Sequence, residues 1–246
     1  MSSFQHLTTE IRPDGAALLT LNRPQQRNAL SIALREELSA CLASWRDDPA
    51  VGAVVIRGSG PVFCAGFDLK DFADPARFDD LFASSARYHR DLWHFPKPVI
   101  AAIDGPALGG GLDLALLCDL RLASESASFG HPEVKFGAPP LYSLLAWVVG
   151  AGPARELCLT GRRIDAAEAL RIGLVNEIVS GDGLLDRALA LAAEILAAPA
   201  ATLRFAKEMM NASAGGDFEA TFAVEHDRAF REVLLPLMAE RGREPG

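Results

Sequence analysis

Two stretches rich in small residues carry the strongest chemical signal in the sequence. The first is 63–70, which reads FCAGFDLK, and the second is 104–113, which reads DGPALGGGLD. In each stretch, small residues stand where a strand-like segment gives way to a helical one. The first amides of a helix have no partner within the helix and lie at the positive end of its dipole. Each junction is therefore suited to bind an anion or a developing oxyanion.

The glycines also have a purely structural interpretation. Glycine permits tight turns and close packing of a helix against its neighbours. However, Gly109, Gly110 and Gly111 open the predicted helix, and each glycine costs a helix about 1 kcal/mol relative to alanine. That cost favours a functional role for the junction, although the residues alone leave both interpretations open.

The composition is that of one large α/β domain or one domain with a small appendage. The chain has 246 residues, half of them apolar, and a net charge of -8. This charge disfavours nonspecific binding to nucleic acid, because a phosphate backbone needs a basic face. The sequence holds no run of eighteen apolar residues and no signal-like N-terminus, so we expect no membrane association and a cytoplasmic protein.

The cysteines and histidines show no metal-binding spacing. The four cysteines are far apart in apolar surroundings and are expected to be buried free thiols. His89 and His94 are expected on a polar helix surface. His131 is expected to be a loop histidine without a role, with contact to a substrate as the alternative. Nucleotide-binding, zinc-protease and serine-hydrolase motifs are absent from the sequence.

Hydrophobic periodicity predicts strands that alternate with helices. Strands are expected at 16–21, 51–57, 99–103, 120–123 and 128–129, and helices at 31–45, 72–95 and 112–118. Either Asn28 or Ser31 is a candidate cap for the helix at 31–45. Three amphipathic helices follow at 184–197, 202–211 and 218–237. We therefore predict a core at 1–180 and a C-terminal helical module at 181–246.

Several segments, in the same order along the chain, resemble the enoyl-CoA hydratase/isomerase (crotonase) superfamily. Residues 61–70, PVFCAGFDLK, are similar to its first signature, and 96–111 are similar to its second. Residues 23–30 and 159–175 match its outer motifs. The resemblance covers roughly residues 10–210. It implies an α/β fold of repeated ββα units with a C-terminal helical region that assembles trimers, often paired into hexamers.

The resemblance also assigns roles to particular residues. It places the backbone amides of Phe67 and Gly110 in an oxyanion hole for a thioester. It places substrate-binding residues for an acyl-CoA along the first signature and in the loop before the first long helix: Arg27, Ala65, Asp68, Leu69 and Lys70. Asp68 is also expected to cap a turn of helix. For Arg27 and Lys70 an ordinary surface charge is an equal alternative. No cofactor is implied, because coenzyme A is part of the substrate.

The resemblance identifies two carboxylates as the acid and base of the reaction. Asp113 and Glu133 stand where hydratases of the superfamily have two glutamates. The apolar neighbours of Asp113 predict burial, which raises the pKa of a carboxyl group toward neutrality. Two such groups can place water on a 2-enoyl-CoA, one taking a proton from water and the other delivering a proton to the α-carbon.

Aspartate at 113 has a shorter reach than glutamate, which leaves isomerisation of an enoyl- or dienoyl-CoA as an alternative. The dienoyl branch uses a third carboxylate, and Leu141 stands at that position. Residues 137–147 also depart from the superfamily pattern and are expected to border the acyl pocket, with Tyr142 in the core or at the rim. Thioester hydrolysis, decarboxylation and acyl-CoA binding without catalysis stay open.

Overall fold

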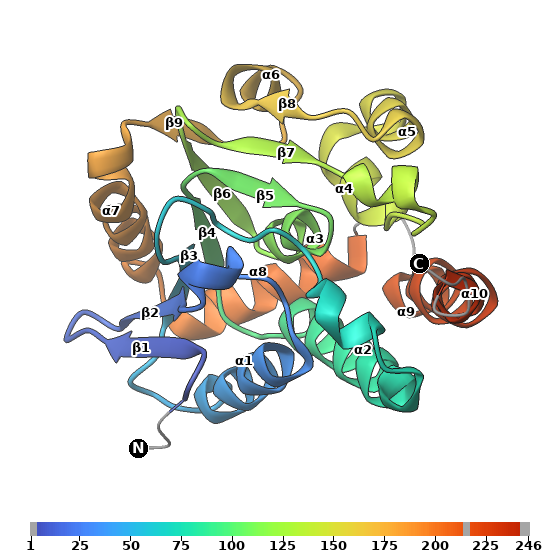
Figure 1. The fold of residues 1–246 in the computed structure, drawn as a ribbon. Helices are drawn as coiled ribbons and strands as arrows, with labels where there is room; N and C mark the ends of the chain where they lie inside the picture. The colour runs from blue at the N-terminus through green and yellow to red at the C-terminus, as the bar shows by residue number, and fades with distance from the viewer. Residues whose placement is uncertain (1–3, 214–216, 242–246) are drawn as a thin grey trace.

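The chain folds around two β-sheets in a computed structural model, which describes residues 4–213 and 217–241 (Figure 1). The larger sheet has the order β1-β2-β3-β4-β6-β9 and the smaller has the order β5-β7-β8. The strands of the larger sheet are β1 (Leu7–Ile11), β2 (Ala16–Leu21), β3 (Ala53–Gly58), β4 (Val99–Ile103), β6 (Leu120–Ser124) and β9 (Glu177–Val179). Those of the smaller sheet are β5 (Pro106–Leu108), β7 (Ser128–Gly130) and β8 (Ile164–Asp165).

Helices cover both faces of the larger sheet, as expected for a mainly parallel sheet. Strands β2 to β9 of this sheet run parallel, and only β1 is antiparallel to its neighbour. Val55 points toward α7 (Leu184–Leu196), whereas Val54 and Ile56 belong to the main core on the other face. That core also holds residues of α1 (Ile32–Trp45), α2 (Phe78–Trp93), α3 (Gly110–Leu116) and α5 (Ala151–Thr160).

The remaining helices surround this core. They are η1 (Pro24–Gln26), η2 (Leu69–Phe72), η3 (Pro75–Arg77), η4 (Pro132–Phe136), α4 (Tyr142–Val149), α6 (Ala166–Arg171), η5 (Gly181–Gly183) and α8 (Ala200–Ser213). The C-terminal helical segment comprises α9 (Phe218–Phe222), η6 (Ala223–Arg228), η7 (Phe230–Leu234) and α10 (Leu235–Arg241), and it lies beside α2 and α4 in Figure 1. No single described helix is long and apolar enough to span a membrane, although the bent pair Gly181–Leu196 and Ala200–Ala212 meets the length and composition criteria together.

Most predicted elements are present with ends shifted by a few residues. Ser31 caps α1 by accepting a hydrogen bond from the amide of Leu34. Asn28, the alternative cap, is instead buried and donates to the carbonyls of Ser59 and Val62. Strands β1, β5, β8 and β9 were not predicted. Only Leu7, the first residue of β1, is buried. The strand therefore has no need for alternating apolar residues, and its sequence lacks the pattern that identifies a strand.

The predicted boundary at residue 180 falls just before α7. This helix packs directly on β3, β4 and β6, so its apolar face completes the layer that covers the sheet. The C-terminal helical segment, in contrast, packs on α2. The division into a core and a C-terminal module stays a prediction.

Candidate active site

The two small-residue junctions lie side by side. The backbone of Cys64 pairs with that of Ala107 in a parallel bridge, with the amide of Leu108 donating to the carbonyl of Cys64 at 3.0 Å. This pairing leaves no room for a side chain at Gly111, where a Cβ would lie 2.2 Å from the Cys64 carbonyl oxygen. Glycine at 111 therefore lets α3 begin directly against the first junction.

The amides of Phe67 and Gly110 are close together and donate no hydrogen bond to any described group. A Cβ on Gly66 would lie only 3.4 Å from the Gly110 nitrogen. Phe67 pairs with Leu30 in a parallel bridge, and this pairing directs the Phe67 N–H away from Leu30. Gly110 is the first residue of α3, so its N–H has no partner within the helix.

Hydrogen bonds to the preceding carbonyls polarise both peptide groups. The Gly66 carbonyl accepts from the amide of Leu30 at 2.8 Å. The Gly109 carbonyl accepts from the amides of Leu112 at 2.8 Å and Asp113 at 3.1 Å. A hydrogen bond accepted by the oxygen of a peptide group strengthens its N–H as a donor. The two free N–H groups can therefore stabilise a negative oxygen placed between them.

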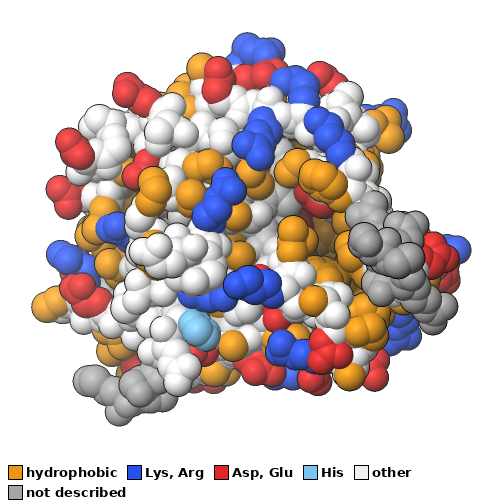
Figure 2. Space-filling model, in the orientation of Figure 1, with side chains coloured by type: hydrophobic (Ala, Val, Ile, Leu, Met, Phe, Trp, Pro, Cys, Tyr) orange, Lys and Arg blue, Asp and Glu red, His pale blue; other side chains and the backbone are white. Residues whose placement is uncertain are grey.

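These amides open onto a cavity of about 600 Å³. Figure 2 shows its face of the molecule, where hydrophobic side chains gather in and around a hollow, with Lys and Arg side chains above and below it. Eight of the nine predicted site residues line the cavity: Arg27, Ala65, Phe67, Asp68, Leu69, Gly110, Asp113 and Glu133. Lys70, the ninth, is exposed and is not part of the described wall.

Asp113 is buried and lines the cavity from the first turn of α3. Its Oδ1 atom has no hydrogen-bond partner among the described residues. Burial raises the pKa of the Asp113 carboxyl to about 7, an effect that nearby His131 partly opposes. The group can therefore hold or release a proton near neutral pH, as a general acid must.

Glu133 lies on η4 and faces the same space. Its Oε1 atom is 2.8 Å from Nδ1 of His131, and a Cβ on Gly109 would be 3.0 Å from its Oε2 atom. His131 lies in a loop, as expected, immediately before η4. Its side chain is fully buried between the two carboxylates, and nothing in the local sequence signals that burial.

The substrate-binding residues predicted along the first signature have different environments. Asp68 is nearly buried, pairs with Arg23 at 2.9 Å and, as predicted, caps a helical turn by accepting from the Lys70 amide. Leu69 is highly exposed at the cavity wall. Arg27 adopts a left-handed backbone conformation that places it at the same wall.

Aromatic rings form much of the remaining wall. The Phe67 ring meets Phe72 and Phe230 edge to face, and the guanidinium of buried Arg35 lies 4.7 Å from the Phe67 ring centroid. The segment 137–147 contributes Ala138, Pro139 and Leu141 to the wall, whereas Tyr142 packs partly buried against the core. Residues of the C-terminal helical segment complete the wall, and their contact with the site was not predicted: Glu225, His226, Ala229, Phe230, Leu234 and Met238.

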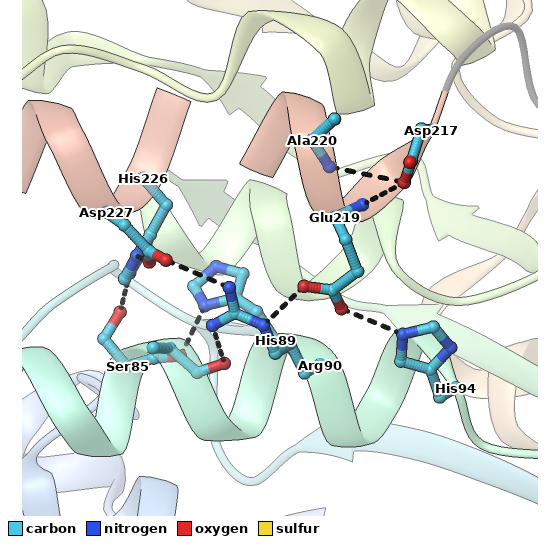
Figure 3. Close-up of polar contacts among 10 residues, drawn as sticks. Ser85, His89, Arg90, His94, Asp217, Glu219, Ala220, His226 and Asp227 are labelled. Atoms are coloured by element: carbon cyan, nitrogen blue, oxygen red, sulfur yellow. Dashed lines mark hydrogen bonds and ion pairs between the residues drawn. The ribbon is translucent and has the colours of Figure 1, made fainter. Parts of the chain in front are cut away.

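A polar network holds this C-terminal helical segment on α2 (Figure 3). Arg90 donates to Glu219 at 2.8 Å and to Asp227 at 3.0 Å. His226 lies between Ser85 Oγ at 2.6 Å and Asp227 at 2.8 Å. Ser85, His226 and Asp227 form a hydrogen-bonded chain like that of a hydrolase triad, but Ser85 is fully buried and does not line the cavity. Their arrangement therefore serves packing and not nucleophilic attack.

His89 also belongs to this network, and the prediction that it lies on a polar surface is wrong. Its ring is fully buried, with Nδ1 2.8 Å from the Ser85 carbonyl and Nε2 3.1 Å from the Tyr88 hydroxyl. His94 is exposed, as expected, and contacts Glu219. The four cysteines are buried free thiols, also as expected. No group of three potential metal ligands occurs among the described residues.

Comparison with known proteins identifies the family. The family model for enoyl-CoA hydratase/isomerase matches residues 12–234. The chain belongs to the enoyl-CoA hydratase/isomerase family. It is 41% identical to a probable enoyl-CoA hydratase of Rhizobium meliloti (strain 1021), over 99% of this chain and 94% of that protein. It is 36% identical to the mitochondrial enoyl-CoA hydratase of Pongo abelii, over 100% of this chain and 84% of that protein.

Solved structures of the same family share the fold. An enoyl-CoA hydratase/isomerase from Xanthobacter autotrophicus Py2 superposes with a TM-score of 0.83 at 35% identity, covering 99% of this chain and 100% of that chain. An enoyl-CoA hydratase from Mycobacterium avium subsp. paratuberculosis K-10 gives a TM-score of 0.86 at 28% identity, covering 99% and 100%. The predicted crotonase-like α/β fold with a C-terminal helical region is thus confirmed.

Proposed function

We propose that this chain is an enoyl-CoA hydratase, which adds water to a 2-enoyl-CoA thioester. The observation that carries the proposal is the convergence on one cavity of two unpaired amides, of Phe67 and Gly110, with two carboxylates, of Asp113 and Glu133. Hydratases among the relatives, at about 41% identity over most of the chain, support the same activity.

The amides bind the thioester oxygen and stabilise the enolate that forms during addition. Because the negative charge on this oxygen is greatest in the transition state, the two N–H groups lower the barrier more than they tighten substrate binding. Both groups belong to the backbone, so the bulky Phe67 side chain does not interfere. Its ring instead forms part of the wall next to the acyl group.

The two carboxylates divide the proton transfers. Glu133 takes a proton from water as the water oxygen bonds to the β-carbon of the substrate. Asp113, whose pKa of about 7 keeps it substantially protonated near neutrality, delivers its proton to the α-carbon. Asp113 becomes ionised and Glu133 becomes protonated. The 3-hydroxyacyl-CoA product carries the hydroxyl group of the water at the β-carbon and the former Asp113 proton at the α-carbon, and proton exchange with solvent returns both carboxyl groups to their starting states.

The coenzyme A part of the substrate extends along the first signature. Ala65, Asp68 and Leu69 border the bound thioester, and Arg27 supplies positive charge to the phosphates from the cavity wall. Lys70 adds a further cation nearby, outside the described wall. No other cofactor is required. We further propose that the chain works in the cytoplasm as a homotrimer or a dimer of trimers.

The direct test is hydration of crotonyl-CoA by the purified chain, followed as loss of the conjugated thioester absorbance. We expect turnover by the wild type and a loss of about 100-fold or more in Glu133→Gln, because a positioned acid or base contributes 10²–10⁴-fold. Glu125→Gln, at an exposed glutamate, is the matched control and should keep full activity. Tight binding of the CoA ester without turnover would instead indicate a non-catalytic binding protein.

Isomerisation of a 3-enoyl- or dienoyl-CoA is the second candidate. Aspartate at 113 favours it, since this position holds aspartate in the dienoyl branch of the superfamily. The presence of apolar Leu141 at the cavity wall argues against it, because the third carboxylate of that branch is missing there. Turnover of these substrates but not of crotonyl-CoA would support isomerisation, and release of free thiol would indicate thioester hydrolysis.

A further inference from the structure

His131 occupies an unusual place between the two carboxylates of the site. It follows β7, immediately before η4, and its side chain is completely buried. Nδ1 lies 2.8 Å from Glu133 Oε1, and Nε2 lies 3.9 Å from Asp113 Oδ1. The ring thus contacts one carboxylate and directs its second nitrogen toward the other.

Three polar atoms in and beside this ring are buried and have no hydrogen-bond partner in the part of the chain that the structure describes. They are Asp113 Oδ1, His131 Nε2 and Glu133 Oε2. Buried polar atoms in folded proteins are nearly always hydrogen-bonded, so three orphan atoms in one place indicate a site for a small polar species. Asp113 and Glu133 line the cavity, which gives a reacting water molecule access to this site.

We propose that His131 is a positioning residue for the hydration reaction, which fixes Glu133 and electrostatically balances both carboxylates. Its Nδ1–H donates to Glu133 Oε1, which leaves Oε2 free to accept the proton of the reacting water. Its Nε2 faces Asp113. The inference rests on the proposed hydratase activity, which the crotonyl-CoA assay tests separately.

The charge movement during hydration explains why a histidine suits this position. Before the reaction the negative charge is on Glu133, and afterwards it is on Asp113, because one group has gained a proton and the other has lost one. An imidazolium that faces both carboxylates stabilises the charge in either place. Among the described residues, His131 is the cationic group that acts on the Asp113 carboxyl, so without it the two neighbouring acids would lose this stabilisation.

The surroundings of His131 are acidic on several sides. Asp113 approaches from α3 and Glu133 from η4, while Glu225 of η6 acts on Asp113 from the C-terminal helical segment. Cys158 of α5 is also near these acids, and burial raises the pKa of its thiol to about 12, so it stays neutral. Burial lowers the pKa of His131, but the hydrogen bond to Glu133 and the charges of both acids outweigh it and leave the pKa raised.

Two variants separate the hydrogen bond from the charge. In His131→Gln a neutral amide can still donate to Glu133, whereas His131→Ala removes both functions. We expect kcat to fall about 10- to 100-fold in the alanine variant, the value of a hydrogen bond to a charged group, and less in the glutamine variant. The KM for crotonyl-CoA should change little. His6→Gln, at a half-buried histidine remote in sequence from the site, is the matched control.

The pH profile provides a readout that simple packing would not affect. His131 lowers the pKa of Asp113, so its removal should raise that pKa. Because Asp113 must be protonated to act, the alkaline limb of kcat/KM should move to higher pH in both variants. An unchanged limb in His131→Gln, or equal activity of the alanine variant and the wild type, would overturn the proposal.

Nuclear magnetic resonance of ¹⁵N-histidine-labelled protein tests the arrangement without any turnover. The His131 signals, assigned from their absence in His131→Gln, should titrate above the ordinary pKa of about 6.5, and Glu133→Gln should lower the midpoint. A wild-type His131 that stays neutral at pH 5.5, or a midpoint unaffected by Glu133→Gln, would contradict the proposal even if hydratase activity is present. A raised, Glu133-dependent midpoint would support the arrangement even if crotonyl-CoA is not the substrate.

Discussion

At the scale of single residues, burial of the Asp113 carboxyl group keeps the proton that the proposed reaction uses, and it also lowers the stability of the folded protein when that group is ionised. Its carboxyl group is buried, and one of its oxygens has no partner among the described residues. The pKa of Asp113 is about 7 in the folded protein and about 3.9 in an unfolded chain. Between about pH 4 and about pH 7 the folded protein therefore holds a proton on Asp113 that the unfolded chain has released. The free energy of unfolding therefore decreases as pH rises from about 4 to about 7.

Asp113→Asn tests this dependence of stability on pH. The amide has the same shape but does not ionise, so the variant should gain stability relative to the wild type as pH rises, by at most about 4 kcal/mol between pH 4 and pH 8. Urea unfolding at the two pH values measures the gain. The variant should also lose hydratase activity. A difference in stability that does not depend on pH would show that Asp113 is not held protonated.

At the scale of elements, the close approach of α3 to the first junction defines the distance between the two amides. This approach depends on Gly111, since a Cβ there would lie 2.2 Å from the Cys64 carbonyl oxygen, a rigid backbone atom. The neighbouring Gly109 is needed for a different reason, because its φ of 55° is a left-handed conformation that other residues adopt with strain.

Gly111→Ala should therefore separate α3 from the loop that carries Phe67. We expect kcat for crotonyl-CoA to fall by about 10²-fold or more, because removal of one oxyanion donor costs 10²–10³-fold. Gly152→Ala in α5 is the matched control, since a Cβ there meets nothing within 4 Å. Equal activity of both variants, with circular dichroism showing intact folds, would indicate that the spacing of the two junctions does not control catalysis.

At the scale of the whole molecule, the C-terminal helical segment lines the cavity and α8 has exposed apolar side chains. Phe205, Met209 and Met210 of α8 are all at least half exposed. Large exposed apolar side chains close together on one helix are typical of an interface. They support the proposed assembly of several copies of the chain.

Phe205→Asp should weaken this assembly by placing a charge in the interface. Light scattering after size-exclusion chromatography should give three or six times the chain mass for the wild type and a smaller mass for the variant. Ile11→Asp, on the edge strand β1, is a control at another exposed apolar residue. A wild type that elutes as a monomer at micromolar concentration would contradict the proposed trimer.

The sequence by itself determined the parts of the site that depend on local order. The glycine-rich junctions, the Asp68 cap and the strand at 99–103 follow from the residue types and their spacing. The same local patterns carry the family resemblance, and the family and the fold are confirmed. Because turn geometry, caps and hydrophobic periodicity depend on neighbouring residues, they are visible in a single chain.

Only the tertiary structure decided which polar groups are buried together. Nothing in the sequence indicates that His131 lies between Asp113 and Glu133, that His89 is buried, or that Phe230 reaches the Phe67 ring. Burial depends on packing between segments that are far apart in the chain, and the pKa of a carboxyl group follows from that burial. The contact of both acids with His131 is therefore a property of the folded molecule, whereas the burial of Asp113 was predicted from its apolar neighbours and the amide pair from the family resemblance.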